Sequence, residues 1–316
     1  MFTVDISIII ATRNREDILW ETIEKACHVA TNKNVEIIVI NDGDSSINIP
    51  NQYLNSIIYF DNPKKGVSSS RNLGAANARG QILFFIDDDM WINSEIIDWI
   101  DEHLVQNKNT KAVYNINWEY PPSLEEELKN HKIGRYILST RYNTMWGRMN
   151  VKGEQPKSGF YPFQAIASCS LLLTKEMFDI IGGYNEDITF QGEDLDLANR
   201  INQLKIPIYC VFDTTLYHNH LDRLHLDGFL KRIGNGYNSQ FLAEHKGLIP
   251  KSLNKYQGSN SSLFNAVLST EKIWIKLHRL IPENKFFDPF TNRLTGLLSV
   301  LEKYKQWKKV VIQSNT

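Results

Sequence analysis

Short apolar runs that end in polar turn residues recur along the first two thirds of the chain. Runs of this kind, typical of buried strands, cover residues 6–11, 36–40, 57–60, 82–86, 165–174 and 206–212. Segments with apolar residues at helical spacing lie between them, over residues 18–27, 66–78, 92–104, 176–181 and 192–201. This alternation predicts an α/β fold with a parallel-rich sheet flanked by helices.

Polar residues follow several of the predicted strands directly. Residues 11–15, Asp42 and residues 87–89 should meet at one edge of the sheet, because the carboxyl ends of parallel strands lie together there. Such an edge is where α/β proteins bind nucleotides. The chain has neither a Gly-x-Gly-x-x-Gly turn nor a Gly-x-x-x-x-Gly-Lys-Ser/Thr loop, so a dinucleotide fold and a P-loop are disfavoured. Bound phosphates would instead need a metal ion.

Three adjacent carboxylates, Asp87, Asp88 and Asp89, follow the apolar run of residues 82–86. In an extended segment Asp87 and Asp89 point to one side and Asp88 to the other. Two carboxylates on one side suit Mg²⁺ or Mn²⁺, whose open positions can take phosphate oxygens. A second interpretation stays open, in which Asp89 caps a helix that begins near residue 92.

A second acidic segment begins a predicted helix at residues 192–201. Glu193 and Asp194 lie in its first turn, directly after Gly192. The helix dipole favours negative charge there, so these acids need no catalytic function. However, Glu-Asp-x-Asp is more acidic than a helix start requires, and a glycine permits close approach of a ligand to the backbone.

Two histidines, His218 and His220, follow the last predicted strand. At positions i and i+2 of an extended segment they share a face, and either could supply a nitrogen ligand to a metal ion. A purely structural function for both is the alternative.

Aromatic and turn-forming residues fill the stretch over residues 110–159. It is interpreted either as a surface excursion with a small core of its own or as a mobile flap whose aromatic rings contact a sugar or a peptide.

Composition and charge limit the partners and the location that we expect for this protein. The 316 residues include 35 basic and 36 acidic side chains, so the net charge of -1 gives no reason to expect nucleic acid as a partner. Three widely spaced cysteines predict reduced thiols. The chain leads from Met1 into a strand without a basic signal region, and no apolar run approaches the ~20 residues that span a bilayer. We expect a cytoplasmic protein.

The last hundred residues predict helices over residues 229–241, 263–280 and 291–312. The last two are amphipathic and basic, and they contain Trp274 and Trp307. Helices of this composition either present a solvated charged face or lie on anionic lipid, so peripheral contact with the inner face of a membrane is an open alternative.

Taken in order, these motifs resemble the GT-A inverting glycosyltransferases of family 2. Residues 7–15 (SIIIATRNR), 38–45, 66–74 (GVSSSRNLG) and 85–89 (FIDDD) are similar to the family's first strand and turn, its Asp-Asp-Gly-Ser segment, its Arg-Asn-x-Gly helix and its Asp-x-Asp motif. Residues 181–200 are similar to the acceptor-side motif of β-galactosyltransferases and polypeptide N-acetylgalactosaminyltransferases.

The resemblance implies a GT-A domain over residues 1–220, with a nucleotide half to about residue 105 and an acceptor half after it, and a helical extension over residues 221–316. It also implies a function for each site residue. The expected donor-site residues are Ala11, Arg13, Asp42, Lys64, Arg71, Asp87, Asp88 and Gly192.

Asp42 would bond the uracil of a UDP-sugar, and Asp89 and His218 would hold Mn²⁺ or Mg²⁺. Asp194 would be the general base, with Glu193 holding donor or acceptor hydroxyls. Ala11 stands in place of the family's usual proline and Arg13 in place of a frequent aromatic residue, which leaves the preference for uridine open.

We therefore expect a hexosyl or N-acetylhexosaminyl transferase that inverts the donor's anomeric configuration. Its acceptor would be a hydroxyl of a glycan, a lipid-linked saccharide or a peptide. Two other classes are weighed against it: a nucleotide-sugar binding module without activity, which would not need Asp194, and a metal-dependent nucleotidyltransferase, which would not need the Glu193–Asp194 helix.

Overall fold

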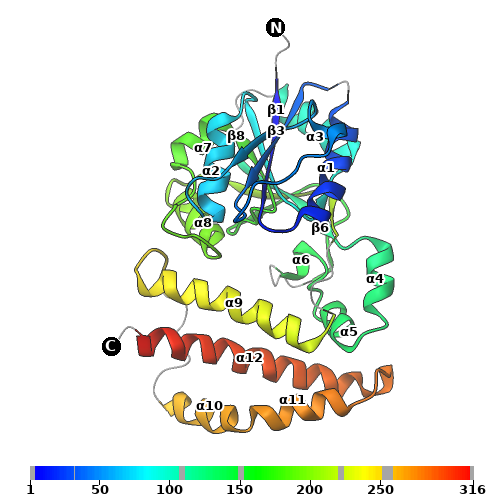
Figure 1. Cartoon of the computed structure of the whole chain (residues 1–316), viewed down its shortest axis with the longest axis vertical. Helices are drawn as coiled ribbons and strands as arrows, with labels where there is room; N and C mark the ends of the chain where they lie inside the picture. The colour runs from blue at the N-terminus through cyan, green and yellow to red at the C-terminus, as the bar shows by residue number, and fades with distance from the viewer. Residues whose placement is uncertain are drawn as a thin grey trace. The chain divides into compact units, whose positions relative to one another are not determined.

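A computed structural model describes residues 4–31, 33–106, 111–148, 153–219, 224–250 and 259–313. The chain divides into two compact units, Met1–Tyr120 with Thr144–His220, and Pro121–Asn143 with Leu221–Thr316 (Figure 1). Residues 121–143 thus group with the C-terminal helices, whereas the sequence predicted a single boundary near residue 220.

The first unit is built on a nine-stranded mixed sheet in the order β3-β2-β1-β4-β8-β6-β9-β5, with β7 paired to β9. The strands are β1 (Ile6–Thr12), β2 (Val35–Asn41), β3 (Ile58–Asp61), β4 (Ile82–Asp87), β5 (Met90–Trp91), β6 (Val113–Glu119), β7 (Phe160–Phe163), β8 (Ser170–Thr174) and β9 (Ile208–His218). Strands β3, β2, β1 and β4 are parallel, and β8 runs antiparallel to β4 and β6. The predicted α/β sheet is confirmed.

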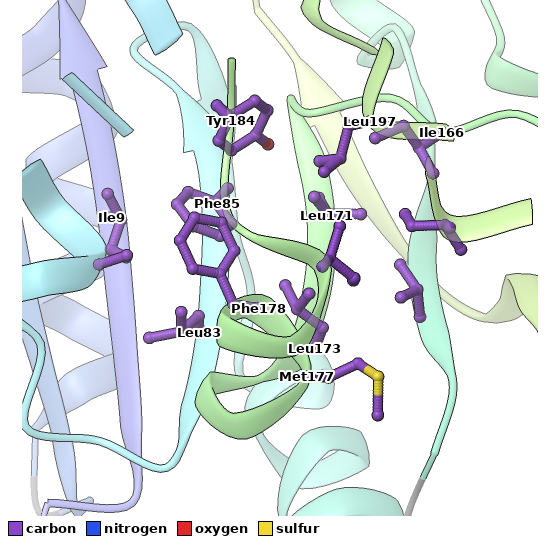
Figure 2. Close-up of a cluster of buried hydrophobic side chains, with 14 of the residues drawn as sticks. Ile9, Leu83, Phe85, Ile166, Leu171, Leu173, Met177, Phe178, Tyr184 and Leu197 are labelled. Carbon is purple, nitrogen blue, oxygen red and sulfur yellow. The ribbon is translucent and has the colours of Figure 1, made fainter. Parts of the chain in front are cut away.

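Helices cover this sheet because each strand places alternate apolar residues on its two faces. The helices and turns of the unit are α1 (Glu16–Ala30), η1 (Asn51–Tyr53), α2 (Val67–Asn77), α3 (Ser94–Ile100), the π-helical turn η2 (Asp101–Val105), α6 (Met145–Arg148), α7 (Lys175–Ile181) and α8 (Glu193–Gln203). On one face Phe85 of β4 packs against Phe178 of α7 and against Tyr184, with ring centroids 5.4 and 5.6 Å apart (Figure 2).

Helix α2 lies unusually close to β1. A Cβ on Gly74 would come within 2.4 Å of Ile9 Cγ2, so only glycine permits this approach. The close packing carries the first turns of α2, including Arg71, to the edge where β1 and β4 end.

Strand β6 corrects the predicted surface excursion. Residues 113–119 pair with β8 and β9 inside the sheet, and Asn115 and Asn117 are both buried. Asn115 Nδ2 donates to the carbonyl oxygen of Ala167 at 2.7 Å, so its amide is satisfied in the interior. The sequence did not predict this strand, because the two buried asparagines interrupt its apolar pattern.

The second unit is helical. It comprises α4 (Pro122–Leu128), α5 (Lys132–Ser139), α9 (Leu226–His245), α10 (Ser259–Ser269), α11 (Glu271–Leu280), η3 (Lys285–Phe287) and α12 (Asp288–Gln313). Helix α12 packs against α5, α9, α10 and α11. Arg135 of α5 pairs with Asp288 at 2.8 Å. This ion pair joins the two segments of the second unit, which are far apart in the sequence. No helix among the described residues combines the length and the apolar character needed to cross a bilayer.

Candidate functional site

The sheet register assembles the predicted edge. Ala11 of β1 lies beside Ile40 of β2 and Asp87 of β4, and Thr12 lies beside Asn41. Asp42 follows immediately, and its backbone N–H donates to the Thr12 carbonyl oxygen at 2.7 Å. Three strands therefore end together, as the sequence predicted.

Asp42 is buried and held from one side. Its Oδ1 accepts hydrogen bonds from Asn62 Nδ2 at 3.0 Å and from the Gly66 N–H at 2.8 Å. Its Oδ2 lies 3.8 Å from Arg13 Nη1, and the Arg13 side chain is itself largely exposed. Asp42 thus has a fixed orientation with its second oxygen toward Arg13. Lys64 is exposed and pairs with Glu186 at 2.7 Å.

The three consecutive aspartates do not continue the strand. Strand β4 ends at Asp87, and Asp88 and Asp89 form a turn before β5. Arg15 reaches both of them: Nη1 lies 2.7 Å from Asp88 Oδ1 and Nη2 lies 2.7 Å from Asp89 Oδ2. The predicted alternation of side chains was therefore wrong beyond Asp87, because the turn brings Asp88 and Asp89 to one guanidinium.

Asp88 is a buried anchor of this turn. Its Oδ2 accepts a hydrogen bond from Thr12 Oγ1 at 2.7 Å, and its backbone oxygen accepts one from Thr22 Oγ1 at 2.8 Å. Burial, followed by the neighbouring Asp89 charge, raises the pKa of Asp88 to about 7. Asp89 does not cap the next helix, since α3 begins at Ser94 and Asn93 Oδ1 accepts from the Ile96 N–H.

Asp89 and His218 are neighbours. Met90 pairs with His218 across β5 and β9, and Asp89 Oδ1 lies 3.7 Å from His218 Nε2. The imidazole stacks against Tyr120 and tilts against Trp118, with ring centroids 5.3 and 5.4 Å away. These aromatic rings at the end of β6 fix the orientation of the histidine. The alternative ligand, His220, lies outside the described residues.

This pair fits a divalent cation. Ligand atoms sit about 2.1 Å from Mg²⁺ and at similar distances from Mn²⁺, so an oxygen and a nitrogen 3.7 Å apart can share one ion. Within the described ranges no group of three or more His, Cys, Asp or Glu side chains could form a complete metal site. Water or the phosphate oxygens of a nucleotide would supply the other ligands.

Arg71 links the strand end to helix α8. Its side chain is only 5% exposed, and it pairs with Asp87 at 2.9 Å and with Glu193 at 3.0 Å. Its guanidinium also lies over the ring of Tyr184, 5.4 Å from the centroid. One buried cation thus holds a predicted donor-side carboxylate and a predicted acceptor-side carboxylate in the same place.

Asp194 has its own donors. The Ser168 backbone N–H donates to Asp194 Oδ1 at 3.1 Å, the Ser168 hydroxyl donates to the same oxygen, and the Tyr184 hydroxyl donates to Ser168 Oγ at 2.8 Å. Gly192 caps the helix with a φ of 102°, a left-handed conformation that favours glycine. Burial first, and then the Glu193 charge, raise the pKa of Asp194 from 3.8 to about 7. A carboxyl with this pKa can exchange protons near neutral pH.

Comparison with known proteins shows the family of the chain. The sequence model of glycosyl transferase family 2 matches residues 7–169, which is just over half of the chain. The chain belongs to glycosyl transferase family 2. An uncharacterized glycosyltransferase of Rickettsia felis is 34% identical over 238 residues, 73% of this family 2 chain and 36% of the relative.

Two further similarities are to a teichoic acid biosynthesis protein and to a solved mannosyltransferase structure. The minor teichoic acid biosynthesis protein GgaB of Bacillus subtilis is 32% identical over 113 residues, 32% of this chain and 13% of GgaB. The chain therefore spans well under half the length of both relatives. The mannosyltransferase PcManGT from Pyrobaculum calidifontis, solved with GDP-Man and Mn²⁺, has a TM-score of 0.54 at 11% identity, covering 96% of this chain and 87% of that one. This likeness confirms the predicted GT-A fold.

Several site residues were missed by the sequence. Thr12 and Arg15 lie in the turn that the motif marked, but nothing in the pattern indicated that they bond Asp88. Ser168 lies outside the motifs, Tyr184 lies within residues 181–200 without an expected function, and only the folded chain brings the two together at Asp194.

Proposed function

We propose that this family 2 protein transfers a hexosyl or N-acetylhexosaminyl group from a UDP-sugar to an acceptor hydroxyl, with inversion at the anomeric carbon and with Mn²⁺ or Mg²⁺. The observation that carries the proposal is the pairing of two separate sites in one unit. Asp89, in the turn after β4, lies 3.7 Å from His218 at the end of β9, where the two could hold a cation, and Asp194 stands at the start of α8 with a pKa of about 7.

The donor would lie along the edge of the sheet. Oδ2 of Asp42, fixed by the bonds to Oδ1, would accept the uracil N–H, with Ala11 and Arg13 lining the base pocket. Lys64, Asp88 and Gly192 are proposed to border the nucleotide-sugar, and Asp87 to face its ribose or sugar. Burial raises the pKa of Asp87, and Arg71 opposes that rise, so Arg71 favours the ionised carboxylate beside the diphosphate.

The proposed reaction needs two functions, a cation beside the diphosphate and a base beside the acceptor hydroxyl. Asp89 and His218 would hold the cation, which neutralises negative charge on the departing diphosphate. Asp194 would take the proton of the acceptor hydroxyl while the acceptor oxygen bonds the anomeric carbon and the bond from that carbon to the phosphate oxygen breaks, so UDP leaves with the electron pair. Glu193, held by Arg71, is positioned to bond hydroxyls of the donor or the acceptor.

Asp89→Ala tests the cation site through binding. We expect the affinity for UDP in Mn²⁺ to fall on the order of tenfold or more, because a carboxylate ligand is lost, and His218→Ala to act in the same direction but more weakly. Calorimetry with UDP, and electron paramagnetic resonance of Mn²⁺, measure both. Asp98→Ala is the matched control, since Asp98 is exposed and pairs only with Lys33 among the described residues. Unchanged Mn²⁺–UDP affinity in Asp89→Ala, or full transfer in EDTA, contradicts the site. Equal affinity for GDP in the wild type would remove the uridine assignment.

Asp194→Asn tests the base. We expect transfer to fall roughly 10²- to 10⁴-fold, because asparagine cannot accept the acceptor's proton, while Mn²⁺–UDP binding persists. Asp196→Asn is the matched control: Asp196 lies in the same helix but pairs with Arg200 at 2.6 Å, and its variant should keep transfer within a few-fold. Turnover of Asp194→Asn near that of the wild type would show that Asp194 serves only the helix start.

The acceptor is proposed to be a glycan or a lipid-linked saccharide, rather than a peptide, on the cytoplasmic side of a membrane. The similarity to GgaB, a teichoic acid biosynthesis protein, supports a cell-surface polymer. A surface of the second unit supports peripheral contact with anionic lipid. On α11, Lys272, Ile273, Lys276 and Leu280 share the face opposite buried His278, and Ile273 and Leu280 are 63% and 70% exposed. Exposed apolar side chains between lysines fit a lipid headgroup layer.

Vesicle sedimentation tests this surface. We expect the protein to pellet with phosphatidylglycerol vesicles but not with phosphatidylcholine vesicles, and the double variant Ile273→Ser with Leu280→Ser to lose most of that binding. Ile180→Ser, which removes a similarly exposed residue of the sheet unit, is the control and should bind as the wild type does. Equal binding to both lipids, or retention by the double variant, would contradict the proposal.

A further inference from the structure

We propose that Ser168 and Tyr184 are positioning residues for Asp194, and that together they select which of its two oxygens meets the acceptor. This inference rests on the proposed function of Asp194 as the base. Ser168 lies outside the sequence motifs, and Tyr184 lies in the segment of residues 181–200 without a function assigned to it.

The bonds run in one direction. Tyr184 Oη donates to Ser168 Oγ at 2.8 Å, and Ser168 Oγ donates to Asp194 Oδ1. Burial raises the pKa of the Tyr184 phenol, so this hydroxyl keeps its proton and can act as the donor. Because Ser168 Oγ accepts this hydrogen bond, its own hydrogen points to the Asp194 carboxylate.

Both donations to Asp194 within the described residues end on the same oxygen. The backbone N–H and the hydroxyl of Ser168 reach Oδ1, at 3.1 Å for the nitrogen. That oxygen is thereby committed to the protein, and Oδ2 is the atom that can receive the acceptor's proton. A rotation of the carboxylate would break two hydrogen bonds at once, so the base has one working orientation.

Burial and the neighbouring carboxylates raise the pKa of Asp194, whereas the hydrogen bond from the Ser168 hydroxyl lowers it. Burial, the Glu193 carboxylate and the Asp87 carboxylate raise the pKa of Asp194, whereas Arg71 and the Ser168 hydroxyl lower it. Arg71 is shared with Glu193 and Asp87, so its charge is not devoted to Asp194. The Ser168 hydroxyl is uncharged and donates to Asp194. Removal of this hydroxyl should raise the pKa of Asp194 further.

The segment that carries Ser168 is held by other contacts. Ala167 exchanges two hydrogen bonds with the side chain of Asn115, and Tyr184 is anchored through its backbone N–H and carbonyl by the side chain of Asn72. Removal of the Ser168 hydroxyl therefore leaves the turn and the tyrosine in place. Its effect should fall on Asp194 rather than on the fold.

The pH dependence of transfer tests the inference. In Ser168→Ala we expect the acid limb of kcat/KM for the acceptor to move up by about one pH unit, because the charged carboxylate loses a donor. Transfer on that limb should fall roughly tenfold, and Mn²⁺–UDP affinity should stay at the wild-type value. Tyr184→Phe should move the limb in the same direction by less, and Ser168→Thr, which keeps a hydroxyl, should restore it.

Ser170→Ala is the matched control, because Ser170 is equally buried two residues away and contacts Asn115 and Met145 instead. An unshifted limb in Ser168→Ala, or the same shift in Ser170→Ala, overturns the inference. If Asp194→Asn loses transfer while Ser168→Ala leaves the limb unmoved, only the inference fails. If Asp194→Asn retains transfer, the proposed function itself fails.

Discussion

The buried guanidinium of Arg71 is the interaction on which the rest of the site depends. Removing carboxylates from water costs several kcal/mol for each ion unless a cation accompanies them. Asp87 ends the central strand and Glu193 begins helix α8, and Arg71 pairs with both while lying over Tyr184. Without it these two carboxylates would lie close together with no positive charge between them. The close packing of Gly74 on Ile9 is what delivers Arg71 there.

A second arginine, Arg15, pairs with two of the three aspartates in the acidic turn. Arg15 and Thr12 engage Asp88, which fixes the turn, while Oδ1 of Asp89 lies toward His218. Three adjacent aspartates thus have three environments: Asp87 with Arg71, Asp88 with Thr12 and Arg15, and Asp89 between Arg15 and His218. Two arginines, Arg15 and Arg71, relieve the repulsion among them.

Sequence patterns predicted the parts of this molecule that follow from local rules. The β-branched runs of β1, β2 and β4 and the glycine-started helix α8 were visible, and so were Asp42, Asp89 and Asp194. Strand β6 was not, because buried Asn115 and Asn117 interrupt its apolar pattern, and their amides donate to Ala167 and Thr215, which lie far along the chain. The same reason hid Ser168: its value to Asp194 arises from 26 residues of chain returning to one point. Grouping of residues 121–143 with the C-terminal helices likewise depends on contacts such as Arg135 with Asp288.

The central claim is that an acceptor hydroxyl, activated by Asp194, attacks the donor from the face opposite the diphosphate. The configuration of the product tests it most directly. With a UDP-sugar donor, Mn²⁺ and a saccharide acceptor, the anomeric proton coupling in the NMR spectrum of the isolated product reports the new linkage. The account predicts an anomeric configuration opposite to that of the donor. A product that retains the donor's configuration would contradict it.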